Sequence, residues 1–288
     1  MQLATVDTAG ARRWGVIADD AIRLAPTDGT LAQTLLGFIA AGEALPDTGA
    51  WEARSLDTVT LAAPIPEPRR NVMCLGLNYA DHAAESQGTA PGEAKLPDYP
   101  VVFTKATTSV TGPRAEVVVD ARATRRLDWE VELAVVIGRG GRFIAADDAM
   151  AHVFGYTIVN DLSARERQKS HQQFFLGKSM DGSCPMGPWL TTADAVADPH
   201  ALAIRSAVNG VVKQDSNTRH LIFRIPDIIA ELSSVMTLLP GDVIATGTPS
   251  GVGFARNPPE YLGDGDVVEC HIEGLGWLRN TIVGPRAA

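Results

Sequence analysis

Two glutamates at alternate positions are the first residues in this sequence whose type and spacing could support chemistry. Glu130 and Glu132 lie in the mostly apolar segment Trp129–Ile137, whose composition predicts a β-strand. Residues i and i+2 of a strand point to the same side, so the two carboxylates are expected to be neighbours. Because Ala134 and Val136 continue that face, it is expected to be covered, and covered carboxylates lose hydration and repel each other. A bound cation would relieve both effects, but a solvated strand face explains the pair equally well.

A third carboxylate favours the cation. The segment Phe154–Asn160 predicts another strand, and Asp161 stands at its end. Taken alone, Asp161 is better explained by turn chemistry. Three carboxylates without a neighbouring cysteine or histidine would form an all-oxygen site, which suits Mg²⁺ or Mn²⁺. The pattern Ser163-x-x-Glu166 that follows predicts a capping box at the start of a short helix.

A histidine and a glutamate three residues apart form a second candidate constellation. The small residues of the segment Leu77–Glu85 favour a helix, in which His82 and Glu85 would share a face. A carboxylate beside an imidazole orients the ring and raises its basicity, which would make a general base. In isolation, a solvated helix face with a chance pair is the more probable explanation.

Further polar residues lie close in sequence to these groups. Lys178 follows a Gln-Gln-Phe-Phe-Leu stretch and could be a desolvated cation, although most lysines are exposed. Arg165 and Gln168, after Asp161, could bind a carboxylate or simply be solvated. The glycine-rich segment Thr246–Gly253 follows an apolar strand and could bring backbone N–H donors close to a ligand, or be an ordinary turn.

The elements expected to position these side chains are mostly strands. Glycine and proline make up 27 and 18 of 288 residues, a modest excess that indicates many turns and a β-rich protein. Asn209-Gly210 predicts a hairpin with a type I′ turn, and Val267–Ile272 with Trp277–Val283 predicts another. One clear helix is expected after Pro226, with an apolar stripe up to Leu239.

The N-terminal part predicts a separate small domain. Residues 1–25 have the pattern of a β-meander, and residues 30–41 have leucine and isoleucine at helical spacing. Three prolines at alternate positions between residues 63 and 70 disfavour both helix and strand. We therefore predict a small domain over residues 1–62, a proline-rich linker over 63–70 and a larger domain over 71–288. The polar, glycine- and proline-rich segment Ser86–Pro100 is a candidate lid.

Charge and composition limit the classes of partner. Lysine and arginine number 25 against 34 aspartates and glutamates, which gives a formal net charge of −9. This balance argues against nucleic acid and against an anionic membrane surface as partners. The sequence shows no pattern of a signal peptide and no apolar run that approaches a membrane span. With three widely spaced cysteines and no disulfide framework, a cytoplasmic location is expected.

Five motifs, taken together and in order, resemble those of a known protein family, although each motif alone is ambiguous. They are Asn-Tyr-x-x-His-x-x-Glu (78–85), Asp-x-Glu-x-Glu (128–132), Asn-Asp-Leu-Ser-x-Arg (160–165), Leu-Gly-Lys-Ser (176–179) and Thr-Gly-Thr-Pro-x-Gly-Val-Gly (246–253). In this order they resemble the fumarylacetoacetate hydrolase family over roughly residues 70–285. The preceding residues resemble the small, variable N-terminal domain of many members.

The resemblance implies a fold, a partner and a set of roles. The fold is an α+β, β-rich mixed β-sandwich roll with a small N-terminal α+β domain, usually in a homodimer. By position, the roles are as follows: metal ligands Glu130, Glu132 and Asp161; water-activating dyad His82 and Glu85; substrate-oxygen lysine Lys178; substrate contacts Arg165, Gln168 and Thr248. The metal is Mg²⁺ or Mn²⁺, and the expected partner is a small anionic 2-oxo acid.

The expected reaction is metal-dependent hydrolysis of a C–C bond in a 2,4-dioxo acid of the acylpyruvate type. In this mechanism, the metal stabilises the departing enolate and His82, oriented by Glu85, activates water. The alternative is an oxaloacetate decarboxylase or a 2-hydroxydienoate isomerase that uses the same site. A non-catalytic acid-binding module is a third possibility, against which the retention of both dyad residues argues.

Overall fold

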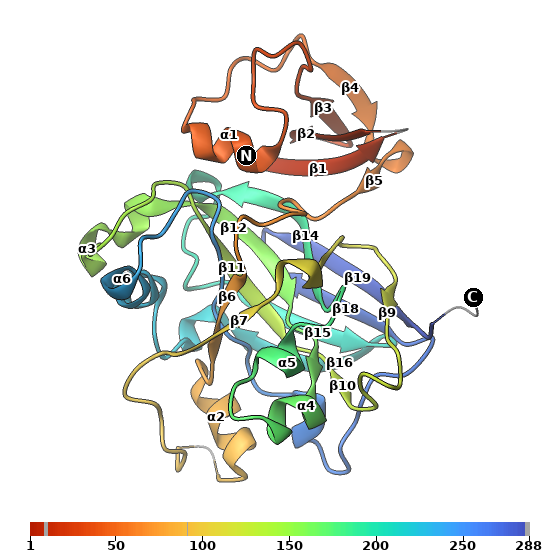
Figure 1. The fold of residues 1–288 in the computed structure, drawn as a ribbon, viewed down its shortest axis with the longest axis vertical. Helices are drawn as coiled ribbons and strands as arrows, with labels where there is room; N and C mark the ends of the chain where they lie inside the picture. Colours follow the sequence, from red (N-terminus) through yellow and green to blue (C-terminus); the bar gives the residue numbers. More distant parts are fainter. Residues whose placement is uncertain (9–10, 91, 286–288) are drawn as a thin grey trace.

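The computed structural model describes residues 1–8, 11–90 and 92–285. Strands dominate these residues, and the helices are few and short (Figure 1). The first strands of the chain form a small body at one end, and the remaining chain forms the larger body next to it. This α+β, β-rich architecture with mixed parallel and antiparallel pairing confirms the predicted fold class.

The largest sheet carries the strands that hold the candidate site. Along its main path it contains β4 (Glu52–Ser55), β3 (Ala21–Leu24), β2 (Ala11–Ala18), β1 (Gln2–Thr8), β14 (Cys184–Thr192), β12 (Val153–Asn160), β11 (Val131–Ile137), β17 (Val243–Ala245), β6 (Val72–Gly76) and β7 (Val101–Lys105). Beside this path, β5 (Thr60–Leu61) pairs with β1 and β8 (Val110–Thr111) pairs with β14. The central strand β11 is antiparallel to both β12 and β17.

Two smaller sheets complete the described β-structure. One contains β16 (Val211–Asn217), β15 (Ala203–Val208), β18 (Val267–Ile272), β19 (Gly276–Val283) and β9 (Val117–Val118), and the other pairs β10 (Leu127–Asp128) with β13 (Ser163–Ala164). Asn209 and Gly210 both have positive φ, at 50° and 77°, which confirms the predicted turn between β15 and β16. The predicted hairpin of β18 and β19 is also confirmed.

The α-helices of the described residues are α1 (Leu35–Ala41), α2 (Ala80–Gln87), α3 (Ala146–Ala149), α4 (Arg165–Ser170), α5 (Phe175–Lys178) and α6 (Ile225–Val235). Helix α6 ends earlier than its apolar stripe predicts, because Leu238 leaves the helix to exchange backbone hydrogen bonds with Gly141. The predicted capping box at α4 is wrong. The Ser163 hydroxyl donates to the Asp161 carbonyl, and Glu166 accepts from Thr124 and Arg125 instead.

Strand β11 lies between two hydrophobic cores, which is why its two faces are both buried. Val131, Leu133 and Val135 belong to one core, on the side of α6 and the five-stranded sheet. Ala134 and Val136 belong to the other core, on the side of β6, β14 and α1. The expectation that the face of Glu132 is covered is therefore confirmed, and a solvated strand face is excluded.

The N-terminal strands confirm the predicted meander, with Asp19 and Asp20 at the turn between β2 and β3. They also join the main sheet, because β1 pairs with β14. Residues 63–70 form neither helix nor strand, yet Ile65 is buried. The division at 62 and 70 into domains and linker stays a prediction. No helix among the described residues is long and apolar enough to cross a membrane.

Candidate active site

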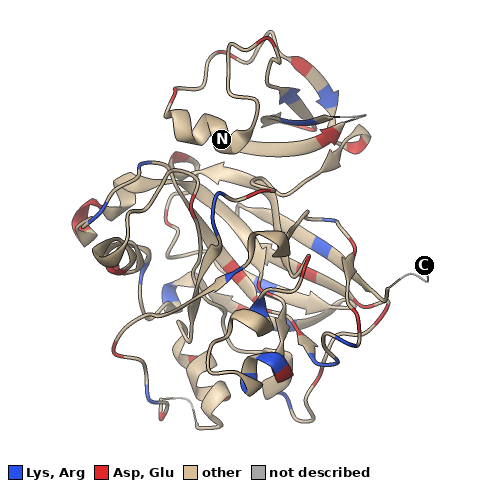
Figure 2. Cartoon of the chain, viewed as in Figure 1, with Lys and Arg blue, Asp and Glu red and all other residues tan. Residues whose placement is uncertain are grey.

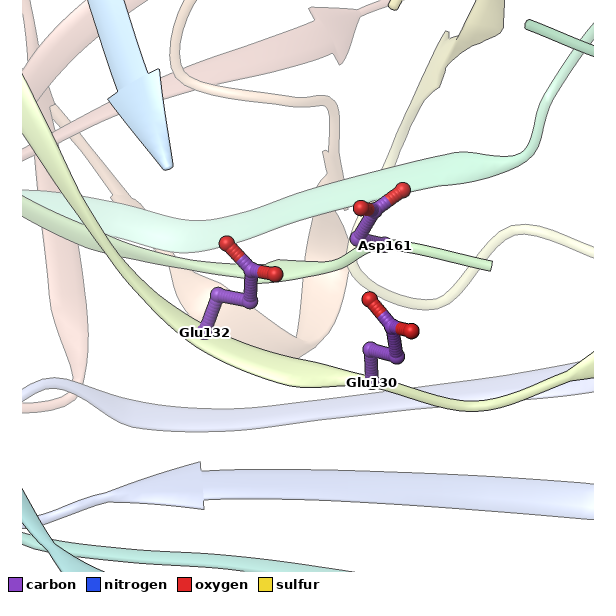
Figure 3. A group of neighbouring side chains, drawn as sticks. All are labelled: Glu130, Glu132 and Asp161. Atoms are coloured by element: carbon purple, nitrogen blue, oxygen red, sulfur yellow. The ribbon is translucent and has the colours of Figure 1, made fainter. Parts of the chain in front are cut away.

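Three buried carboxylates meet where β11 begins and β12 ends. Val131 pairs with Asn160 in the antiparallel register, and the Asp161 N–H donates to the Glu130 carbonyl at 2.8 Å. This pairing brings Glu130, Glu132 and Asp161 together although about 30 residues separate them in sequence. One carboxylate oxygen from each lies within 4.8 Å of the others, and Figure 3 shows the three groups around a common space.

Three buried cations surround two of these carboxylates. The Lys178 ammonium lies 2.7 Å from Glu130 Oε2 and 2.6 Å from Asp161 Oδ2. Lys105 lies 2.7 Å from Asp161 Oδ1, and Arg165 lies 2.6 Å from Glu130 Oε1. Figure 2 shows that acidic and basic residues occur close together within the larger body. Burial raises the pKa of Glu130, but the charges of Lys178 and Arg165 outweigh burial and hold it below its ordinary value.

Glu132 differs from the other two carboxylates because no cationic side chain among the described residues pairs with it. Its Oε2 accepts a hydrogen bond from the Gly247 N–H at 2.8 Å. Burial, together with the neighbouring charges of Asp161 and Glu130, raises the pKa of Glu132 well above its ordinary value. A buried carboxylate in this position lacks a counter-charge, and three convergent carboxylates are the hard oxygen ligands that Mg²⁺ and Mn²⁺ bind. The residues present therefore fit a divalent cation.

The histidine and glutamate of α2 form a close pair. His82 Nδ1 lies 2.7 Å from Glu85 Oε1, and the Gly251 N–H donates to Glu85 Oε2 at 2.9 Å. Asn78, just before the helix, donates to the Thr246 carbonyl at 2.8 Å, so the glycine-rich loop contacts both ends of this unit. With Nδ1 facing the carboxylate, Nε2 is the ring nitrogen left for a substrate or water. The predicted helix and the predicted His82–Glu85 contact are both confirmed.

One cavity of about 330 Å³ joins the two constellations. Seven of the nine predicted site residues line it: His82, Glu130, Glu132, Arg165, Gln168, Lys178 and Thr248. The other two, Asp161 and Glu85, lie behind the wall in contact with Lys178 and His82. The candidate lid Ser86–Pro100 contains residue 91, which lies outside the described residues. Ser86 also lines the cavity, and movement of this segment stays a prediction.

The three predicted substrate contacts are already engaged by the protein. Arg165 donates from Nε to Asp128 at 2.8 Å and from Nη1 to the Gln168 side-chain oxygen at 2.9 Å. The Thr248 hydroxyl donates to the Val131 carbonyl at 2.9 Å and accepts from Gln214 at 2.7 Å. These side chains line the cavity, but their contacts show a positioning function within the protein. Their role in substrate binding stays a prediction.

Sequence reasoning missed two residues that complete the buried network. Lys105 is the last residue of strand β7 and contacts Asp161. The one sequence signal for it is that a lysine ends a largely apolar run. Asp128 belongs to the Asp-x-Glu-x-Glu motif. Its carboxylate accepts from Arg165 and from the backbone N–H groups of Gly253 and Phe254. It therefore anchors both Arg165 and the end of the glycine-rich loop.

Comparison with known proteins shows the family to which this chain belongs. Residues 71–283 match the family described as fumarylacetoacetate (FAA) hydrolase C-terminal. This match covers most of the chain, and the chain therefore belongs to the fumarylacetoacetate hydrolase family, a family of enzymes.

Two named relatives are oxaloacetate tautomerases. The chain is 49% identical over 228 residues to oxaloacetate tautomerase YisK of Bacillus subtilis, covering 79% of this chain and 74% of that protein. It is 45% identical over 273 residues to the mitochondrial oxaloacetate tautomerase FAHD2A of Homo sapiens, covering 91% and 83%.

Solved structures of the family share the whole fold. A fumarylacetoacetate hydrolase from Exiguobacterium antarcticum superposes with a TM-score of 0.88 at 41% identity, covering 99% of this chain and 100% of that one. A maleylpyruvate hydrolase from Sphingobium sp. SYK-6, in complex with manganese(II) and pyruvate, superposes with a TM-score of 0.80 at 32% identity, with the same coverage.

Proposed function

We propose that this protein is a divalent-metal-dependent enzyme that interconverts the keto and enol forms of a small 2-oxo acid, with oxaloacetate as the first candidate. The observation that carries this proposal is one small cavity lined by members of both an incompletely neutralised carboxylate cluster and the His82–Glu85 pair. Two relatives at 49% and 45% identity are named oxaloacetate tautomerases, which supports the choice of substrate.

Each residue of the site has its own role in the proposed reaction. His82 Nε2 would take a proton from C3 of the keto form, while Glu85 holds the Nδ1–H and fixes the tautomer of the ring. Lys178 uses two N–H donors on Glu130 and Asp161, so a third is left for the oxygen that gains negative charge. Glu130, Glu132 and Asp161 would hold Mg²⁺ or Mn²⁺, which supplies Lewis-acid polarisation of the 2-oxo group.

Hydrolysis of a C–C bond in an acylpyruvate is the second candidate. The same His82 nitrogen could take a proton from water instead of from carbon, and a solved relative of similar fold is a maleylpyruvate hydrolase. The relatives named above at the highest identities are tautomerases, so hydrolysis, which the motifs alone ranked first, now ranks second. Decarboxylation of oxaloacetate needs the same enolate and is a third activity to measure.

The test separates the reactions by substrate. Tautomerisation is followed as the loss of enol absorbance of oxaloacetate and as C3 deuterium exchange, and hydrolysis is followed as the cleavage of acetylpyruvate. We expect rapid tautomerisation that falls about 100-fold or more in His82→Gln, within the range for general acid–base catalysis. His220→Gln, which changes an exposed histidine outside the cavity, is the matched control and should keep full activity. Fast acetylpyruvate cleavage without tautomerisation would establish the hydrolase instead.

The identity of the metal, the homodimer and the cytoplasmic location are further proposals. Mn²⁺ is present in the solved maleylpyruvate hydrolase, and metal titration will decide between Mg²⁺ and Mn²⁺ here. The homodimer and the cytoplasmic location stay predictions, and one relative is named as mitochondrial. The solution mass of the protein tests the first of these two.

A further inference from the structure

Lys169 is a cation in the wall of the cavity that lies outside the buried network of ion pairs. It is exposed, it lines the cavity, and its ammonium lies 4.6 Å from the centre of the Phe254 ring. Arg165 lies over the same ring at 4.5 Å, and the Phe254 N–H donates to Asp128 at 2.9 Å, so this ring is anchored. Within the described part of the chain, no carboxylate forms an ion pair with Lys169.

The other three cations around the cavity are committed to the carboxylates of the protein. Lys178 pairs with Glu130 and Asp161, and Lys105 pairs with Asp161. Arg165 pairs with Asp128 and Glu130. Each of these side chains is buried, and its charge is already matched by carboxylates of the protein, although Lys178 keeps one N–H donor for the 2-oxo end of the substrate.

The net charge of the buried cluster indicates how many negative charges of a bound substrate it can neutralise. With all four carboxyl groups ionised, as metal ligation requires of Glu132, the cluster carries one net negative charge. Its members are the carboxylates of Asp128, Glu130, Glu132 and Asp161 and the cations of Lys105, Arg165 and Lys178. A divalent cation would convert this to one positive charge, which matches a 2-oxo acid with a single carboxylate. A substrate with two carboxylates needs one more positive charge at the far end of the cavity.

We propose that Lys169 binds the second carboxylate of the substrate and so makes the site selective for 2-oxo dicarboxylic acids over 2-oxo monocarboxylic acids. This inference rests on the proposed function, because it takes the carboxylate cluster as the place where the 2-oxo acid end binds. The contact with Phe254 holds the side chain over the cavity mouth but uses only the face of the ring, so the N–H donors of the ammonium stay free. Lys169 is a specificity residue and has no part in proton transfer.

The experiment compares two probes that differ only at the group Lys169 would bind. The dicarboxylate 3,3-dimethyl-2-oxosuccinate has no C3 hydrogen and cannot tautomerise, and 3,3-dimethyl-2-oxobutanoate carries a methyl group in place of its second carboxylate. Each is titrated by calorimetry into the Mn²⁺-loaded protein in the cold, with product analysis to verify that the probe is intact. The variants are Lys169→Met, which keeps a stem over Phe254, and Lys169→Arg, which keeps the charge.

The matched control is Arg142→Met. Arg142 is also exposed and also lies over a phenylalanine, 4.7 Å from the centre of the Phe143 ring, but it does not line the cavity. Loss of a hydrogen-bonded charge pair corresponds to about tenfold or more in affinity. We expect Lys169→Met to lose about tenfold in affinity for the dicarboxylate and less than about twofold for the monocarboxylate. Lys169→Arg should recover the preference, and Arg142→Met should not change it.

Two results would overturn the inference: Lys169→Met weakens both probes alike, or it leaves the affinity for both probes unchanged. The proposed function can fail independently of these. A protein that prefers the dicarboxylate through Lys169 but does not accelerate tautomerisation of oxaloacetate contradicts the proposed function and supports the inference. A protein with tautomerase activity but no preference between the probes contradicts the inference alone.

Discussion

The buried carboxylate cluster and the His82–Glu85 pair lie at the same cavity but are built in different ways. The cluster combines side chains from β11, the end of β12, β7 and α5, and its charges are shared among several partners. The pair lies within one turn of a helix of eight residues, and one hydrogen bond from the glycine-rich loop holds its carboxylate.

Because the two regions are built differently, substitutions in them should affect folding stability and activity differently. In the cluster, each charge is buried and a change to one member leaves another without its partner, so the effect on stability depends on which member is changed. In the pair, Glu85 is 20% exposed, and water can replace a lost partner at little cost in folding free energy. We therefore expect substitutions in the cluster to change both stability and activity, and substitutions in the pair to change activity alone.

The largest effect is expected for Glu132→Gln. The loss of this ligand should remove the Lewis-acid contribution of the metal and lower activity about 1,000-fold, which corresponds to about 4 kcal/mol. Glutamine can still accept from the Gly247 N–H, and the substitution removes a carboxyl group whose ionisation is opposed by burial and by the neighbouring carboxylates. The metal-free variant should therefore be more stable than the metal-free parent by about 1 kcal/mol in urea unfolding. A destabilised metal-free variant would show that Glu132 is already neutralised in another way.

Asp161→Asn should have the opposite effect on the metal-free protein. Asp161 pairs with both Lys105 and Lys178, and its neutralisation leaves the buried Lys105 ammonium without a carboxylate. Removal of one partner of a buried ion pair destabilises by about 3 kcal/mol or more. Urea unfolding in EDTA measures this loss directly. If Asp161→Asn and Glu132→Gln change stability in the same direction, the assignment of charges within the cluster is wrong.

Glu85→Gln tests the pair without a change in side-chain size. The neutral amide cannot stabilise positive charge on His82, so the activity should fall about 100-fold, which corresponds to about 2.7 kcal/mol. The unfolding free energy should stay within about 1 kcal/mol of the parent because the carboxylate is partly exposed. Activity and unfolding are measured on the same preparation. A large loss of stability with a small loss of activity would remove the pair from the mechanism.

The smallest effect is expected for Gly251→Ala in the loop that links the two regions. Gly251 has a φ of 103°, and an added Cβ would lie 2.1 Å from the Lys213 carbonyl, so the loop must shift. The shift should weaken the Gly251 contact with Glu85 and lower activity about tenfold, or about 1.4 kcal/mol.

Gly265→Ala is the control for this substitution. Gly265 has a φ of 88° but has open space around the position of a Cβ, so the substitution adds similar backbone strain without a clash. Equal losses of activity in Gly251→Ala and Gly265→Ala would mean that the loop contact has no specific effect.

The two regions also differ in how far the sequence predicts them. The His82–Glu85 contact follows from helical spacing, which acts over three residues, and it could be predicted from the chain alone. The β-hairpin at Asn209–Gly210 was predictable for the same reason, because the turn is local. Strand spacing places Glu130 beside Glu132, but Asp161 was only a candidate third ligand until the family resemblance assigned it, since its meeting with them depends on the pairing of β11 with β12.

Lys105 and Asp128 could not be assigned from the sequence because their partners are distant in the chain. Lys105 reaches Asp161 across 56 positions, and Asp128 holds Arg165 and the loop at Gly253. The capping box predicted from Ser163 and Glu166 failed for a related reason. Both side chains have the right spacing, but tertiary contacts, with Thr124 and Arg125 for Glu166, replace the local ones.

The most direct test of the central claim is a titration of EDTA-treated, dialysed protein with Mn²⁺, with free Mn²⁺ measured by electron paramagnetic resonance. The account predicts that the parent protein binds one Mn²⁺ per chain and that Glu132→Gln binds it at least 100-fold more weakly. If Mn²⁺ stays free with the parent protein, or if Glu132→Gln binds one Mn²⁺ with the parent affinity, then the carboxylate cluster is not the metal site.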